Sequence, residues 1–318
     1  MYTASDIQVF FFAHNRADFL REALDCYLNQ TVQGAQLILL ANAPTPEVLD
    51  VAREYAPKGV DLIVEEKPLG VYGSVARCQQ IATAPITFMA HDDDLVHPAY
   101  VENVLHAYNT IPDLAVALSS MGEFSETPEY TGLSKVYTLS APEFSAYIYA
   151  GNSFCFSSCT YKTEFLKQAP APKFNTFGKI SDVPFMLGAT GKHKAAIFDF
   201  HFVRYRTHAA QDCQTFSTGP TAEQWLNMEK LHKDLIFSAE KLNLRLAFYL
   251  SHYFRLRMGW RDWCLCEHDK MTFSDYIELA KQKQLYCPGA YFIGHFIHGK
   301  PRRKLVNLCL NKKAAPMP

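Results

Sequence analysis

Short apolar runs alternate with amphipathic segments through the first hundred residues, and this alternation restricts the possible fold more than any other feature. The apolar runs have the length and composition of buried strands. They span residues 7–13, 37–41, 60–64 and 86–90. The segments between them carry apolar residues at helical spacing. They span residues 19–30, 47–55 and 74–82. The alternation predicts an α/β fold with a mostly parallel central sheet flanked by helices, Rossmann-like in outline.

Three consecutive aspartates, Asp92, Asp93 and Asp94, follow the apolar run 86–90. Since adjacent carboxylates repel each other at neutral pH, the triplet indicates a nearby cation, and carboxylate oxygens suit Mn²⁺ or Mg²⁺. A solvated acidic turn is the alternative, because aspartate is common at turns.

Other polar residues are expected beside the aspartates, because ligands of open α/β sheets bind at the carboxyl ends of the strands. They follow the other predicted strands or lie in the glycine-containing turn 69–73 and the helix after it. They are Asn15, Arg16, Asn42, Gly73 and Arg77.

Composition excludes several classes of protein. The 318 residues are 48% hydrophobic and 20% charged, as in globular proteins, and the net charge of −1 gives no electrostatic case for a nucleic-acid partner. The nine cysteines lack the spacing of a disulfide framework or a zinc site, which favours free thiols in a reducing, cytoplasmic compartment. We expect no signal peptide and no membrane-spanning run.

Three segments together resemble the family 2 nucleotide-sugar glycosyltransferases of GT-A type. Residues 13–31, AHNRADFLREALDCYLNQT, are similar to the family's opening strand end, Asn-Arg turn and helix. Residues 69–98, LGVYGSVARCQQIATAPITFMAHDDDLVHP, are similar to its glycine turn, Ala-Arg helix and Asp-rich metal motif. Residues 179–211 are similar to the segment that ends in Tyr-Arg-x-His. The resemblance extends over residues 7 to about 212.

The resemblance implies a bacterial enzyme that transfers a sugar, with inversion, from a nucleotide sugar to an acceptor hydroxyl. UDP-sugars are the family's most frequent donors, and the acceptor would be a surface polysaccharide or lipopolysaccharide. Asp94 matches the family's metal ligand, and His208 matches a histidine near the metal or diphosphate. The donor would contact Asp92, Asp93, Asn15, Arg16, Gly73, Arg77 and Asn42, the last in place of an aspartate near the base.

Asp182 is the candidate general base. Ser181-Asp182 stands where the family has Glu-Asp, and the second acid is the one normally assigned to the base. A helix cap is the alternative role, because Pro184 follows at a first-turn position. His91 replaces a further family aspartate, and we leave it outside the predicted metal shell.

We predict a GT-A domain over 1–220, divided into a nucleotide-sugar half, 1–112, and an acceptor half, 113–220, with a lid at 209–220. A mostly helical region with a basic tail follows at 221–318. The tail has basic residues around an apolar core of Leu305, Val306, Leu308 and Leu310. Such a segment is typical of peripheral contact with the inner face of a membrane, and an ordinary surface helix is the alternative.

Two other functions remain open from the sequence. A nucleotidyltransferase also needs acidic metal ligands, but it favours a glycine- and Arg/Lys-rich phosphate loop where this chain has HNRADF. A non-catalytic module that binds nucleotide sugars would keep Asp92 and Asp94 without needing Asp182.

Overall fold

The structure is a computed structural model. It describes residues 1–119, 133–152, 154–206, 208, 221–266, 271–297, 299–310 and 313–314. The predicted lid, 209–220, lies outside these residues.

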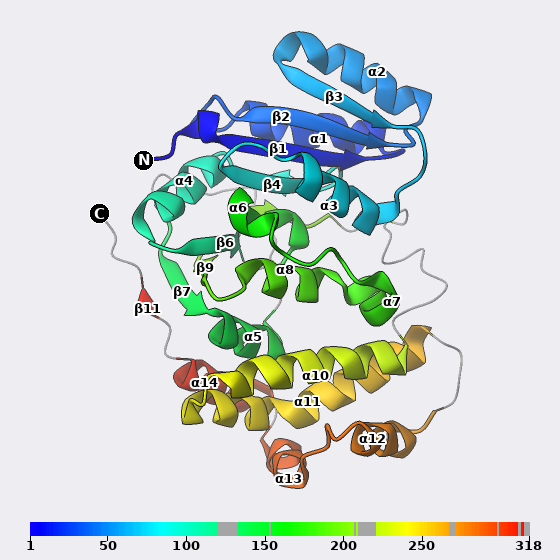
Figure 1. Cartoon of the computed structure of the whole chain (residues 1–318), viewed down its shortest axis with the longest axis vertical. Coiled ribbons are helices and arrows are strands. Elements are labelled where there is room, and N and C mark those ends of the chain that lie inside the picture. The colour runs from blue at the N-terminus through cyan, green and yellow to red at the C-terminus, as the bar shows by residue number, and fades with distance from the viewer. Residues whose placement is uncertain are drawn as a thin grey trace.

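The first four strands are parallel and form one half of the central sheet (Figure 1). They are β1 (Ile7–Ala13), β2 (Gln36–Asn42), β3 (Val60–Glu65) and β4 (Ile86–His91), in the spatial order β4-β1-β2-β3. Val9 and Phe11 of β1 enter the core on one face of the sheet, and Phe10 enters the core on the other. Burial on both faces explains why β1 is apolar at every position from Val9 to Ala13 rather than alternating.

The other half of the sheet contains both strand directions. It consists of β6 (Leu114–Ser119), β7 (Val136–Ser140), β8 (Thr160–Lys162), β9 (Lys194–Phe198) and β11 (Lys313–Ala314). The full order is β11-β7-β9-β6-β8-β4-β1-β2-β3, and only β7 and β8 run against the other seven strands. The predicted mostly parallel sheet is therefore confirmed.

A separate two-stranded ribbon pairs β5 (Leu95–Val96) with β10 (Val203–Arg204). Leu95 lies opposite Arg204, and Val96 lies opposite Val203. The ribbon therefore brings the segment around Arg206 next to the aspartates that precede β5.

Helices cover both faces of the sheet (Figure 1). One face packs against α1 (Ala17–Leu28), α2 (Pro46–Tyr55) and α4 (Tyr100–Thr110). The other packs against α3 (Gly70–Ile81), α5 (Ala141–Tyr149), α6 (Thr163–Leu166) and α8 (Asp182–Thr190), and the short α7 (Phe174–Phe177) precedes α8. Single 3₁₀ turns occur at η1 (Ala4–Asp6), η2 (Ala56–Lys58), η3 (Phe156–Ser158) and η4 (Gly178–Ile180).

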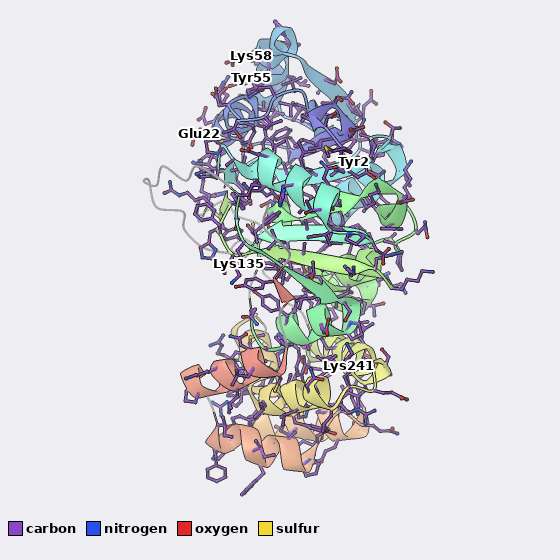
Figure 2. All side chains as sticks on the ribbon, turned by 90° about the vertical axis from the view of Figure 1, so that its left-hand side faces the viewer. Tyr2, Glu22, Tyr55, Lys58, Lys135 and Lys241 are labelled. Carbon is purple, nitrogen blue, oxygen red and sulfur yellow. The ribbon has the colours of Figure 1, made fainter. Side chains whose placement is uncertain are left out.

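The C-terminal region is helical, as predicted, and packs below the sheet in Figure 1. It comprises α10 (Ala222–Ser238), α11 (Leu242–Cys266), α12 (Phe273–Gln282), α13 (Pro288–Phe296) and α14 (Gly299–Cys309). The apolar core continues into it through Ile236, Phe248 and Val306. Lys241, labelled in Figure 2, donates to Glu143 of α5 over 3.1 Å. Within the described residues, none of the helices combines the length and apolarity needed to cross a membrane.

One local expectation was wrong. Gly73 does not lie in a turn, because α3 already begins at Gly70, whose φ of +67° favours glycine.

The segment 154–161 is not continuous strand. Its middle is the turn η3, closed by a hydrogen bond from the Ser158 N–H to the Cys155 carbonyl, and β8 begins only at Thr160.

The predicted basic tail is also only partly a surface feature. Arg302 is 2% exposed, and its guanidinium donates to the Ala150 carbonyl over 2.9 Å. Val306, one turn further along α14, and Leu310, directly after the helix, are fully buried. This side of α14 therefore anchors the C-terminal region to the end of α5.

A buried ion pair holds α10 against α11. The guanidinium of Arg255 lies 3.2 Å from the carboxylate of Glu229, and both side chains are almost fully buried. We expect Arg255→Met to destabilise the fold by about 3–5 kcal/mol, because it leaves a buried carboxylate without its cation. Urea unfolding measures this loss. The double variant Arg255→Met/Glu229→Gln should recover part of it, and a single variant as stable as wild type would contradict the expectation.

Candidate active site

The aspartate triplet lies at the carboxyl edge of the sheet, immediately after β4. In the sheet register, Phe12 of β1 lies beside both His91 of β4 and Leu40 of β2, so the three strands end together. Arg16 and the aspartates follow β1 and β4, and Asn42 is the last residue of β2, so these residues lie at one edge, as the sequence predicted. All three aspartates are buried, with exposed fractions of 0% for Asp92, 6% for Asp93 and 3% for Asp94.

Arg16 pairs with the first two aspartates. Its Nη2 lies 2.6 Å from Asp92 Oδ1, and its Nη1 lies 2.5 Å from Asp93 Oδ2. Burial raises the pKa of the Asp92 carboxyl to about 7, because Arg16 only partly opposes desolvation and the neighbouring charge of Asp93 adds to it. The single charge of Arg16 does not balance two carboxylates, so a second cation nearby would favour their ionised forms.

Asp94 is held by neutral donors instead. Its Oδ2 accepts a hydrogen bond from the hydroxyl of Ser157 and a weaker one, at 3.4 Å, from the thiol of Cys155. Its Oδ1 accepts from the backbone N–H of Arg206 over 3.1 Å. The guanidinium of Arg206 turns elsewhere, to the Asp93 carbonyl and to Glu22 of α1. These contacts fix the orientation of Asp94 without cancelling its charge.

His91, Asp93 and Asp94 form a group with the donor atoms of a metal site. One ligand atom from each lies within 4.8 Å of the others. The Nε2 of His91 is buried and has no hydrogen-bond partner within the described part of the chain, and Nδ1 lies 3.8 Å from Asp94 Oδ2. Carboxylate oxygens with an imidazole nitrogen suit Mn²⁺ or Mg²⁺, so the residues present fit a divalent cation.

His208 lies at the same site, on the other side of Asp93. Its Nε2 is 3.1 Å from Asp93 Oδ2, and its ring packs on Phe19 with centroids 4.7 Å apart. The structure therefore brings His208 to the aspartates, as predicted, but next to Asp93 rather than Asp94.

Asp182 is the first residue of α8 and lies near His91. Burial raises the pKa of the Asp182 carboxyl to about 6, although backbone N–H groups at the start of the helix and the charge of His91 oppose the rise. Tyr72 of α3 lies close by, since its hydroxyl donates to the Lys179 carbonyl over 2.6 Å and the charge of Asp182 adds to the effect of burial in raising the pKa of Tyr72. A carboxyl with this pKa can take up a proton near neutral pH.

Asn42 and Arg77 lie at a second corner of this edge, around the end of β3. Asn42 Oδ1 accepts from the Leu69 N–H over 2.8 Å, and Arg77 Nε lies 2.6 Å from Glu65 Oε1. Glu65 and Asn42 are partners in the β2–β3 register. Leu69, at the start of α3, therefore holds Asn42, and Glu65, at the end of β3, holds Arg77. Gly73 lies in the first turn of α3, close to both.

A cavity of about 460 Å³ opens between the first turns of α1 and α2. Asn15 and Arg16 line it from the β1 loop, and Thr45 and Glu47 line it from the start of α2. Arg16 lines this cavity and also pairs with Asp92 and Asp93, so the cavity adjoins the aspartate site.

Sequence reasoning missed four contributors to this site: His91, Cys155, Ser157 and Tyr72. His91 directly precedes the triplet but was excluded because an isolated histidine is more often packed. The hydroxyl and thiol groups inside the run FCFSSCTY were a signal that this segment serves a polar partner.

The comparisons with known proteins agree with this geometry. A family model described as "Glycosyl transferase family 2" matches residues 9–168. Among solved structures, S. aureus TarS 1-349 in complex with UDP-GlcNAc has a TM-score of 0.57 at 13% identity, covering 78% of this chain and 72% of that one. The mannosyltransferase PcManGT from Pyrobaculum calidifontis, in complex with GDP-Man and Mn²⁺, has a TM-score of 0.52 at 11% identity, covering 96% and 85%. At these identities, the likeness establishes a shared fold. No curated protein matches the sequence.

Proposed function

The chain belongs to glycosyl transferase family 2, and from this premise we propose that it is an inverting, metal-dependent glycosyltransferase. The donor is a nucleotide sugar, with a UDP-sugar as the first candidate. The acceptor is a hydroxyl group of a bacterial surface glycan or lipopolysaccharide.

One observation carries this proposal. The carboxyl edge of the sheet holds a buried aspartate and histidine group that fits a cation, and a separate carboxyl, Asp182, whose pKa is raised to about 6. A site that only binds a nucleotide needs the first of these but not the second. A carboxyl whose pKa is raised by burial, beside a group that fits a metal ion, is typical of sites that carry out acid–base chemistry.

In the proposed reaction, Asp182 acts as the general base. Its carboxylate takes the proton of the acceptor hydroxyl as that oxygen forms a bond to the anomeric carbon of the sugar. The bond between the anomeric carbon and the diphosphate oxygen breaks, and its electron pair leaves with the nucleoside diphosphate. Attack on the face opposite the leaving group inverts the anomeric centre.

Asp94 and His91 would hold the divalent cation, Mn²⁺ or Mg²⁺, with Asp93 and His208 beside them. When bound, such a cation supplies positive charge that neutralises the departing diphosphate. Ser157 and the Arg206 backbone N–H keep Asp94 oriented for this role.

The remaining residues of the edge would bind the donor. Arg16 reaches both Asp92 and the cavity, so it is suited to place the ribose and diphosphate. Asn42 and Arg77, at the corner next to Glu65, would meet the base, with Asn15 and Gly73 on either side. We propose 1–112 as the donor half, 113–220 as the acceptor half and 221–318 as an attached helical region.

Titration of the protein with UDP, GDP, CDP and dTDP, each with and without Mn²⁺, tests the donor assignment. We expect calorimetry to detect binding of UDP that requires Mn²⁺, because the diphosphate adds negative charge to an already acidic loop. Binding of one nucleotide without metal would contradict the role of the aspartates, and binding of none would contradict the proposed function.

A further inference from the structure

The helix α13 presents an apolar face to solvent. Phe292 and Phe296 are each 66% exposed, with ring centroids 4.9 Å apart, and Ile293 between them is 41% exposed. The fully buried residues of α13 are the small Ala290 and Gly294. A Cβ at Gly294 would lie 2.5 Å from Tyr253 Cβ, so the helix lies directly on α11. Tyr291 and His295 also contact Tyr253, with ring centroids 4.9 and 5.3 Å away, whereas Phe292 and Phe296 point to solvent.

The helix α14, at the same end of the molecule, also has a buried side and an exposed apolar side. It begins three residues after α13 ends. Val306 is buried, as is Leu310 directly after the helix, whereas Leu305 is 40% exposed and Leu308 is 72% exposed. Both helices lie in the part of the protein remote from α2 (Figures 1 and 2). We call the exposed apolar residues Phe292, Ile293, Phe296, Leu305 and Leu308 the outer face of α13 and α14.

The charged residues in and around α13 and α14 are positive. Residues 279–318 contain eight Lys and Arg and no Asp or Glu, although the whole chain has a net charge of −1. Lys281 and Lys283 pair with Glu278 and Glu223, and Arg302 is buried. The other five, including the exposed Lys304, belong to α14 and the residues after it.

We propose that the outer face of α13 and α14 binds the surface of an anionic lipid bilayer. Paired aromatic rings and leucines beside lysines match the interface between acyl chains and anionic headgroups. Electrostatic attraction to that surface adds to apolar burial. A second copy of this chain is a poorer partner, because a two-fold contact would bring two positively charged segments together. The contact concerns α13 more than the basic tail itself, whose Arg302, Val306 and Leu310 face inward.

The membrane contact has a consequence that rests on the proposed function. The acceptor of the glycosyltransferase would be carried on a lipid at the surface to which the protein binds. The contact itself is independent of the sugar chemistry, so the two can be tested apart.

Co-sedimentation of the full chain with vesicles tests the contact. We expect binding to vesicles of phosphatidylglycerol and phosphatidylcholine, and much weaker binding to phosphatidylcholine alone. Phe292→Gln/Phe296→Gln should weaken the binding roughly tenfold or more, because two apolar anchors are lost. Lys304→Gln should weaken it by about fivefold and reduce its dependence on salt. The matched control is Leu62→Gln/Val64→Gln, at two positions of β3 that are each 44% exposed.

Three results would overturn the inference. They are no binding of the wild type to either vesicle, equal binding of the phenylalanine variant, or a wild-type dimer that this variant dissociates.

Release of UDP from a UDP-sugar without acceptor serves as a separate readout. The phenylalanine variant should keep this release while losing vesicle binding. No release by the wild type would count against the proposed function and leave the vesicle result standing.

Discussion

Asp94→Asn is expected to abolish Mn²⁺-dependent binding of the nucleotide and to lower turnover by about 10³-fold or more. Arg16 pairs with Asp92 and Asp93, whereas Asp94 accepts hydrogen bonds from the neutral Ser157 hydroxyl and Arg206 backbone N–H, so Asp94 keeps a charge that a bound cation would balance. Asparagine keeps the size of the side chain and removes that charge. Loss of a cation that stabilises the leaving diphosphate costs several kcal/mol of the barrier, and each ~1.4 kcal/mol is a factor of ten.

Mn²⁺ titration of the apoprotein, followed by calorimetry with UDP, measures this effect without relying on turnover. Asp61→Asn is the matched control, because Asp61 is an exposed aspartate of β3, and its carboxylate accepts a hydrogen bond from Gln36. It should bind Mn²⁺ and UDP like the wild type. If Asp94→Asn also bound both normally, the cation would have to be held elsewhere.

The position of this site was predictable because it depends on local pattern. The strand 7–13 was expected at the residues where β1 is found, since short apolar runs between polar loops mark their own ends. Parallel strands then place every following loop at one edge. Arg16, Asn42 and the aspartates were brought together by this rule alone.

The partners within the site were not predictable, because they depend on contacts between distant parts of the chain. Ser157 is 63 positions from Asp94, and the Arg206 N–H is 112 positions away. Nothing in the local pattern around Asp94 points to either. The inward side of α14 was missed for the same reason: Arg302 looks like a surface residue until the Ala150 carbonyl, 152 positions earlier, is found beside it.

Asp182→Asn is expected to keep donor binding and to lower turnover by about 10²–10⁴-fold, the usual cost of losing a general base. In the wild type, kcat/KM should fall as the pH drops below about 6, because protonation of Asp182, whose pKa is raised to about 6, removes the base. Steady-state kinetics over an assay range of about pH 5 to 8 would reveal this decrease in kcat/KM. Normal turnover of the variant would make the base assignment wrong.

The same substitution should stabilise the fold at high pH. Between the ordinary carboxyl pKa of 3.8 and about 6, the folded protein retains a proton on Asp182 that the unfolded chain releases. The free energy of unfolding of the wild type therefore falls as the pH rises through this window. Asp182→Asn removes that penalty, a gain on the order of 2–3 kcal/mol above pH ~7 that vanishes near pH ~4.

Urea unfolding at both pH values measures the difference. Asp275→Asn is the control for the loss of an acid in a first helical turn, because Asp275 is exposed and caps α12, so its removal should destabilise. A residue kept only as a helix cap would behave like Asp275. If Asp182→Asn instead stabilises the fold and abolishes turnover, the wild-type Asp182 carboxylate costs stability and serves the reaction.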